Sequence, residues 1–301
     1  MTTVRIVEPF RSLFYVPQFV ALHGGHLAAE GLEISLRTAG GGLSTTGALI
    51  DGDADICLGG IMRSLDVADR GGPCLPHFAG VNSKNGFFLL SREPRPRFAW
   101  ADVAGRTVIS FAEAPTPWQC MLTVLRSHGV DPATVRIERT LPVAEAVAAF
   151  ERGHGDFLEQ GQPVVEQMIV AGRAHLAASM GEATGPVPFS SYMTTWETLR
   201  DRRELVARFA RALYRAQRWM HGAAADEIAS LIAPSFPDIA PDIRERVIAR
   251  FKRQDTWARD PLLRREGYDY LHRILRDGGF IKGTHRYEDL IDTEIAREVM
   301  G

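Results

Sequence analysis

The fold is decided by residues 4–62, which read VRIVEPFRSLFYVPQFVALHGGHLAAEGLEISLRTAGGGLSTTGALIDGDADICLGGIM. Two strand-like runs, Val4–Val7 and Glu33–Thr38, alternate with short helical patterns, of which the first is Pro17–Gly24. This alternation is typical of a parallel sheet built by right-handed crossovers. Such sheets bind ligands at the carboxyl ends of their strands, so we expect a site in the loops that follow the strands.

Three segments of this stretch resemble one protein family: Phe14–Leu22 (FYVPQFVAL), Gly31–Ile34 (GLEI) and Gly52–Ile56 (GDADI). It is the family of solute-binding proteins for alkanesulfonates, taurine, nitrate and thiamine-pyrimidine precursors, whose fold the thiamine-pyrimidine synthase shares. The resemblance covers most of the chain. It implies an α/β fold of two lobes, the periplasmic-binding-protein type II fold, with the ligand in the cleft between them. Members of the family bind unrelated molecules, so the resemblance leaves the ligand open.

The strand–helix cycle starts a second time near Trp100, after the proline-rich connection Arg92–Arg97. The pattern becomes wholly helical after Thr195, with Glu197–His221, Asp260–Asp277 and Tyr287–Met300 each predicted as one helix. We therefore expect a discontinuous first lobe (residues 1–90 and 191–301) and a continuous second lobe (residues 91–190). The chain should cross between them near residues 90–98 and 187–194.

The composition is that of an ordinary globular protein: 301 residues, 45% apolar and 24% charged, with a formal net charge of −2. No long run of one charge sign indicates a nucleic-acid partner, and no stretch has the length and apolarity of a membrane span. Cys57, Cys74 and Cys120 have no spacing that is typical of a disulfide framework or a zinc site. We predict no metal and no cofactor.

Seventeen residues are predicted to contact a ligand, because each lies after a predicted strand or at a crossing: Ser12, Phe14, Tyr15, Gly41, Ser44, Thr45, Gly59, Gly60, Arg63, Asn82, Glu113, Thr116, Trp118, Glu159, Gln160, Ser191 and Tyr192. In the first lobe, aromatic rings could clamp a flat ligand and a hydroxyl could orient it. Arg63 could hold an acidic group in two-pronged fashion. The glycines allow close backbone approach, and the helix starts after them offer free N–H groups.

Each of these residues also has an ordinary structural interpretation. Phe14 and Trp118 could be core residues, Ser44 a plain helix cap, Arg63 a solvated surface charge, and Glu159 a polar loop residue. Glu113 and two prolines replace the small Gly/Ser string that the resemblance implies for the loop of the second lobe. Proline lacks an N–H group and Glu113 repels anions, which mildly favours a ligand with an amine group, such as a pyrimidine-like thiamine precursor. A sulfonate-like or aromatic organic molecule stays open as the alternative ligand.

Two functions stay open at this stage. The first is a small-molecule binding protein that serves an ABC-type importer, with no direct insertion into the membrane. The second is an intracellular enzyme or sensor that uses the same cleft. The first cleft loop, residues 8–15, holds no cysteine, unlike the desulfinase that shares this fold, and no residue is predicted as catalytic. An export signal upstream of Met1 would indicate a periplasmic protein, and a native start at Met1 a cytoplasmic one.

Overall fold

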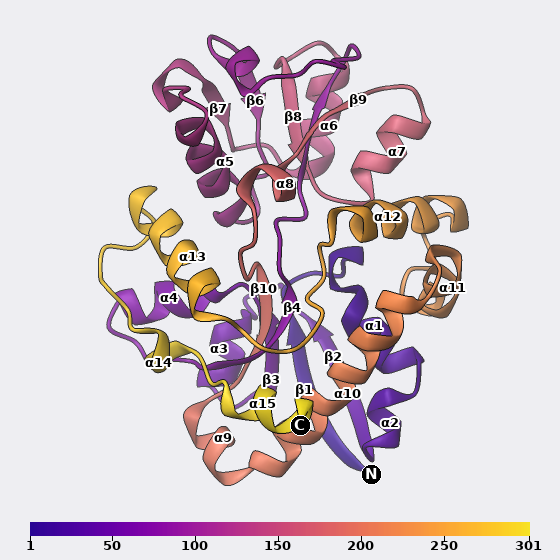
Figure 1. The fold of residues 1–301 in the computed structure, drawn as a ribbon, viewed down its shortest axis with the longest axis vertical. Helices are drawn as coiled ribbons and strands as arrows, with labels where there is room; N and C mark the ends of the chain where they lie inside the picture. Colours follow the sequence, from indigo (N-terminus) through magenta and orange to yellow (C-terminus); the bar gives the residue numbers. More distant parts are fainter.

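Two five-stranded sheets form the scaffold of the structure, a computed structural model that describes residues 1–301. The first sheet has the strand order β2-β1-β3-β10-β4 and the second has the order β7-β6-β8-β5-β9. Figure 1 shows the two sheets at opposite ends of the molecule, each flanked by helices. The predicted α/β class with a helical C-terminal region is confirmed. The strands are β1 (Thr2–Glu8), β2 (Leu32–Thr38), β3 (Ile56–Gly59), β4 (His77–Asn82), β5 (Phe88–Ser91), β6 (Thr107–Ile109), β7 (Arg136–Glu138), β8 (Phe157–Gln160), β9 (His175–Ser179) and β10 (Ser190–Met193).

Each sheet is parallel except for one strand, which corrects the expectation of a purely parallel sheet. In the first sheet, Ile6 of β1 lies opposite Leu36 of β2 and Ile56 of β3 in parallel register, whereas β10 runs antiparallel to β3 and β4. In the second sheet, β5 runs antiparallel to β8 and β9. The two exceptions are the strands by which the chain enters a sheet directly from the other one. Because the chain reaches each of them from the other sheet and not by a crossover along its own sheet, they start at the edge where the parallel strands end.

The chain leaves the first sheet after Asn82 and enters the second at Phe88, and it returns between Ser179 and Ser190. The first change of sheet thus precedes the crossing expected at residues 90–98, because residues 88–91 already pair with β8 and β9. The lobe boundaries at residues 90 and 191 stay a prediction. We call the first sheet with α1–α4 the first unit, and the second sheet with α5–α8 the second unit.

Fifteen α-helices surround the sheets: α1 (Val16–His23), α2 (His26–Ala29), α3 (Thr45–Ile50), α4 (Ile61–Asp69), α5 (Thr116–Ser127), α6 (Val143–Glu151), α7 (Val164–Val170), α8 (Met180–Thr184), α9 (Trp196–Asp201), α10 (Arg203–Gly222), α11 (Ala225–Leu231), α12 (Pro241–Gln254), α13 (Arg265–Asp277), α14 (Tyr287–Leu290) and α15 (Glu294–Met300). Short 3-10 helices occupy Leu13–Tyr15, Trp100–Val103, Pro132–Thr134 and Ala233–Ser235. No helix combines the length and the apolarity that a bilayer crossing requires.

Arg202 interrupts the single helix that was predicted for residues 197–221. Its backbone leaves the helical region (φ −127°, ψ 34°) between α9 and α10. Its Nη1 donates to Oδ1 of Asp55 at 2.6 Å, and the Asp55 carboxylate also accepts from the Arg5 side chain and backbone. Asp55 is almost fully buried, so this pairing compensates a buried charge at the cost of one helix break.

The last predicted helix, residues 287–300, is likewise divided into α14 and α15. Between them Ile291 forms a β-bridge with His77, and the Asp292 backbone N–H donates to the His77 carbonyl at 2.9 Å. The edge strand β4 thereby gains a partner. The helix predicted from Asp260 begins only at Arg265, because Asp260 accepts from the Leu262 backbone N–H and the Arg264 side chain in a turn.

Candidate functional site

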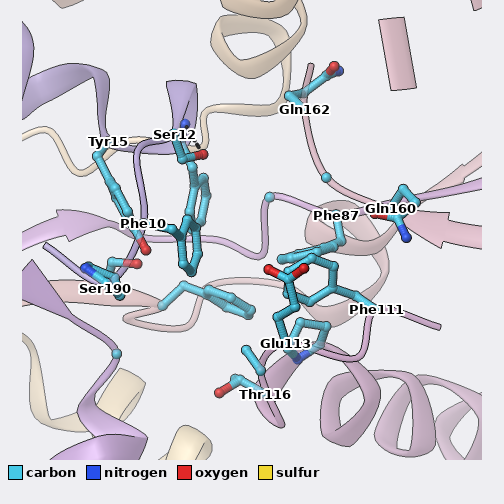
Figure 2. Close-up of a pocket in the computed structure, with 18 of the residues that line it drawn as sticks. Phe10, Ser12, Tyr15, Phe87, Phe111, Glu113, Thr116, Gln160, Gln162 and Ser190 are labelled. Carbon is cyan, nitrogen blue, oxygen red and sulfur yellow. Dashed lines mark hydrogen bonds between the residues drawn. The ribbon is translucent and has the colours of Figure 1, made fainter. Parts of the chain in front are cut away.

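A cavity of about 270 Å³ lies between the two units, at the edges of the sheets where the parallel strands end. Its walls come from the loop after β1, the start of α4, the two crossings, the loops after β6 and β8, and helix α12 (Figure 2). Segments that are far apart in the chain thus meet in one place. The location agrees with the rule that sheets of this kind bind ligands at the carboxyl ends of their strands.

Aromatic side chains dominate the cavity wall. Seven lining residues are aromatic: Phe10, Phe14, Tyr15, Phe87, Phe111, Phe189 and Phe251. Their rings contact one another around the cavity, with centroids 5.5 Å apart for Phe10 and Tyr15, and 4.8 Å apart for Phe87 and Phe111. Figure 2 shows Phe10 on one side of the space and Phe87 and Phe111 on the other. Such a space suits a flat apolar group, which would stack on the rings and displace poorly bound water.

The 3-10 turn that carries Phe14 and Tyr15 is held by a dense set of hydrogen bonds. Ser12 caps it, because its Oγ accepts the Phe14 backbone N–H at 3.1 Å. The Phe14 carbonyl accepts two side-chain donors, Nδ2 of Asn82 and Nε1 of Trp257, each at 2.9 Å. Asn82 and Trp257 are both buried. The position of this part of the wall is therefore fixed before any ligand arrives.

The positive charge available to a ligand comes from Arg63, on the first turn of α4. Arg11 also lines the cavity, but its Nε is paired with Oε1 of Glu8 at 2.6 Å, whereas the half-buried Arg63 has no carboxylate partner. Helix α4 begins at the cavity wall with Gly60 as its cap, so its first N–H groups and its dipole add to the same positive field. An acidic group would find its strongest attraction here.

Tyr15 and Ser190 place two hydroxyls close together in the cavity wall (Figure 2), and the charge of Arg63 acts on the Tyr15 hydroxyl. Burial raises the pKa of the Tyr15 hydroxyl well above its usual value, and the charge of Arg63 and the contact with Ser190 lower it only in part. Tyr15 therefore stays protonated at any working pH and can donate a hydrogen bond.

The side of the cavity that carries Phe87 and Phe111 also presents polar groups, of which only one is charged. Glu113 is exposed and has no ion-pair partner, and Gln160, Gln162 and Thr116 add amide and hydroxyl groups. Because Glu113 faces solvent, water screens its charge more than it screens the half-buried Arg63.

Eight of the predicted residues lie on the cavity wall: Ser12, Phe14, Tyr15, Gly60, Arg63, Glu113, Thr116 and Gln160. They include every predicted residue of the loop after β1. They come from both sides of the cavity, the side with Arg63 and the side with Glu113. Whether they bind a ligand stays a prediction.

The structure does not bring the loop after β2 to the cavity. Gly41 lies in an exposed turn, and Ser44 caps α3, where its Oγ accepts the Gly47 backbone N–H at 2.9 Å. Thr45 and Gly59 are buried beneath the wall, against each other. The strand β2 is at the edge of its sheet, so the loop that follows it ends away from the centre where the cavity forms.

Two predicted residues, Glu159 and Ser191, do not line the cavity, but the residue next to each in the sequence does. Strand β8 extends to Gln160, so alternation turns Gln160 to the cavity and Glu159 into the second unit, where it accepts from the Ser110 hydroxyl. In β10, Ser190 lines the cavity, whereas Ser191 is buried with its Oγ 2.7 Å from Nδ1 of His77. The sequence analysis took Glu159 and Gln160 as residues that follow a strand, whereas strand β8 includes both.

Three further predicted residues support the structure around the cavity. The Tyr192 hydroxyl donates to Oε1 of Gln18 at 2.9 Å, and Asn82 supports the Phe14 carbonyl. Trp118 points away from the cavity and lies under the Arg139 guanidinium, 4.0 Å from its ring centroid. For Trp118 and Tyr192, packing explains the residue without a ligand.

Sequence reasoning missed Phe87, Phe111, Phe189 and Phe251. The first three flank crossings or strand ends, so the rule that selected Phe14 could have found them. No sequence signal marks Phe251, because it lies on the buried face of an ordinary amphipathic helix. None of the three cysteines lines the cavity, and no group of three or more His, Cys, Asp or Glu residues is arranged to hold a metal ion.

Comparisons with known proteins point to one family. The profile of the family described as NMT1/THI5 like matches residues 15–225. "Putative binding protein YtlA" of Bacillus subtilis (strain 168) is 30% identical over 302 residues, which cover 99% of this chain and 90% of that protein.

Two solved structures show the same fold at low identity. The ligand-binding component of an ABC-type import system from Staphylococcus aureus, with zinc bound, has a TM-score of 0.78 at 11% identity and covers 99% of both chains. The alkanesulfonate-binding protein SsuA from Xanthomonas axonopodis pv. citri, bound to MOPS, has a TM-score of 0.74 at 16% identity and covers 97% of this chain and 99% of that one.

Proposed function

The chain belongs to the NMT1/THI5-like family, and from this we propose that it is a binding protein for a small organic molecule with a flat apolar part and an acidic group. The molecule occupies the cavity between the two units. The observation that carries the proposal is a ring-lined cavity whose unpaired cation is Arg63.

The two parts of the ligand have separate recognition elements. The flat part stacks between Phe10 and Tyr15 on one side and Phe87 and Phe111 on the other. The acidic group lies against the Arg63 guanidinium and the first turn of α4. Each charge-assisted hydrogen bond contributes about 1.5–3 kcal/mol, and a micromolar dissociation constant corresponds to about −8 kcal/mol. Ring stacking and one such anchor supply part of that affinity, and the apolar area that the ring buries supplies the rest.

Glu113 favours a second candidate ligand, because its carboxylate can attract an amine group. Such a ligand is a ring with an amine group, for example a thiamine-pyrimidine precursor. Glu113 is the one carboxylate on the wall, and it has no partner within the protein. Its exposure makes it the weaker anchor of the two, so we place the acidic ligand first.

Three probes separate the ring, the acid and the amine by isothermal titration calorimetry. Naphthalene-1-sulfonate carries a flat ring and an acid, methanesulfonate the acid alone, and 4-amino-5-hydroxymethyl-2-methylpyrimidine a ring with an amine. We expect naphthalene-1-sulfonate to bind most tightly and methanesulfonate at least about 100-fold more weakly, because two lost stacking contacts remove about 1–3 kcal/mol beyond the area term. If the pyrimidine binds most tightly, the acidic ligand is ruled out and the amine-bearing ligand becomes the assignment. If none of the three binds below 1 mM, the assignment of the cavity as a ligand site is overturned.

The proposed partner is the membrane component of an ABC-type importer, to which the protein delivers its ligand. The support is the fold that the chain shares with the ligand-binding component from S. aureus. The test is uptake of the ligand by cells that carry or lack the gene, together with fractionation of the native protein. Delivery to an importer requires uptake to fall in the deletion strain and the protein to be found outside the cytoplasmic membrane. Unchanged uptake, or a purely cytoplasmic protein, contradicts it.

A further inference from the structure

Helix α12 follows the return of the chain to the first sheet, yet it contacts the second unit. Nε of Arg250 on α12 donates to Oε1 of Glu166, which lies in the first turn of α7. The side chain of Glu166 is 3% exposed and that of Arg250 17%, so this ion pair is largely removed from water. Figure 1 shows α12 directly below α7, between the two ends of the molecule.

The next residue on α12 forms part of the cavity wall. Phe251 is fully buried and lines the cavity. Its ring centroid is 5.9 Å from that of Phe14, in the first unit, and 6.1 Å from that of Phe88, in the second sheet. On helix α12, Arg250 thus pairs with the second unit, and the next residue, Phe251, completes the cavity wall.

The partner of Arg250 also orders the wall that faces it. The Glu166 backbone N–H donates to Oε1 of Gln162 at 3.1 Å, and Gln162 and Pro163 both line the cavity. The Arg250–Glu166 pair therefore acts on the lining segment before α7 without reaching the cavity itself.

The C-terminal end of α12 makes a second attachment. The Gln254 amide donates to the Asn85 carbonyl at 2.8 Å, within the first crossing, and it accepts from the Ser179 hydroxyl at the end of β9. The approach requires a glycine, because a Cβ at Gly181 would lie 2.4 Å from the Asn85 carbonyl oxygen and 2.5 Å from the Gln254 amide nitrogen.

We propose that Arg250, Gln254 and Glu166 form a clasp that ties helix α12 to the second unit, while Phe251 of the same helix packs on Phe14 of the first unit, and that this clasp sets the affinity and the residence time of the ligand. The three residues are positioning residues, since none of them lines the cavity. The clasp must open for a ligand to enter or leave.

A buried ion pair suits a reversible clasp of this kind. The desolvation of two buried charges roughly cancels their attraction, so opening the clasp to water has a small net cost. The contacts of a ligand with both walls then decide which state is populated. Loss of one partner has a different effect, because the remaining charge favours the open state, in which water solvates it.

The test compares Glu166→Gln and Arg250→Ala with Arg253→Ala, a control on the exposed face of the same helix. Small-angle X-ray scattering without ligand is expected to give a larger radius of gyration for the two clasp variants and an unchanged one for the control. The exchange Arg250→Glu with Glu166→Arg should restore the parent value. Glu166→Gln keeps the volume of the side chain and removes its charge, and circular dichroism checks that each variant is folded.

The affinity part of the proposal rests on the proposed function. With naphthalene-1-sulfonate as probe, we expect the dissociation constant of Glu166→Gln to rise at least about tenfold, mainly through faster dissociation. Gly181→Ala should act in the same direction by pushing Gln254 away. Equal radii of gyration in parent and clasp variants overturn the clasp, whatever the probe does. Failure of the probe to bind the parent overturns the proposed ligand, and the scattering data still decide on the clasp.

Discussion

The backbone at Gly86 lies against the ring of Phe14, so closely that a Cβ atom at Gly86 would be 2.3 Å from Cε2 of the ring. Gly86 belongs to the first crossing and Phe14 to the turn after β1, and both line the cavity. The first crossing thus packs directly on the Phe14 ring. A substitution at Gly86 or at Phe14 therefore changes the shape of the cavity wall.

We predict that Gly86→Ala weakens both the fold and ligand binding. The added methyl group must displace the Phe14 ring, and overpacking of this kind costs about 1–3 kcal/mol, part of which appears as lost affinity. Calorimetry with naphthalene-1-sulfonate measures the affinity and thermal unfolding the stability. Gly161→Ala is the matched control, because Gly161 also lines the cavity but its Cβ would lie 3.5 Å from the Phe87 ring, an ordinary contact. An equal loss of affinity in both variants would contradict the role of the Phe14 ring.

A second prediction concerns the anchor of the acidic group. Arg63→Ala should weaken binding of naphthalene-1-sulfonate by about 1.5–3 kcal/mol, roughly 10- to 150-fold, because a charge-assisted hydrogen bond is lost. Arg63→Lys should lose less, since the charge remains but the two-pronged geometry does not. Arg70→Ala, at the other end of α4, removes an exposed arginine that pairs with Asp66 and should change nothing. If Arg63→Ala binds as the parent does, the acid lies elsewhere.

The buried carboxyl of Glu159 predicts a pH dependence of stability. Burial raises its pKa from 4.5 to about 7, and the hydrogen bond from Ser110 lowers it only in part. The unfolded chain releases this proton from about pH 4.5 upward, while the folded protein keeps it until about pH 7. The free energy of unfolding should therefore fall across this window, by up to ~3 kcal/mol.

Glu159→Gln should remove that fall, because the amide has no proton to release. We expect the variant to be more stable than the parent at pH 8 and close to it at pH 4, as measured by urea unfolding at each pH. Glu145→Gln, on the exposed face of α6, provides the control. A parent whose stability is flat between pH 4.5 and 7, relative to the Glu159→Gln variant, would contradict the prediction.

Asp55 predicts the opposite dependence. Although burial alone would raise its pKa, hydrogen bonds from Arg5 and Arg202 lower it from 3.8 to about 2. Its ionised form therefore stabilises the fold above pH 3.8, and the contribution disappears as the pH falls towards 2. Asp55→Asn should cost about 2 kcal/mol at pH 7 and little near pH 2. Asp53→Asn, an exposed neighbour, is the control, and an equal loss in both variants would show that the buried pairing is unimportant.

The sequence was sufficient for the class of fold and for the place of the cavity, because both follow from strand–helix alternation. It was not sufficient for side-chain direction. Glu159 and Gln160 are neighbours at the end of the same strand, and side-chain alternation turns Gln160 to the cavity and Glu159 into the second unit. The helix break at Arg202 depends on Asp55, a partner 147 residues away, and no local pattern reports such a contact.

The same limit applies to Phe251. A phenylalanine on the buried face of an amphipathic helix has the same local pattern whether it packs against a core or against a ligand. Only the tertiary path of the C-terminal region, which returns to the cavity after the second unit is complete, distinguishes the two.

The position of β10 in the first sheet has a consequence for how the chain folds. β10 lies between β3 and β4, so these two strands have no direct contact and are joined only by a strand that is made after the whole second unit. During synthesis the second unit can fold on the ribosome while β3 and β4 still have unpaired edges, which are sites of wrong pairing and aggregation. The first unit can therefore complete its sheet only after the second unit has been made.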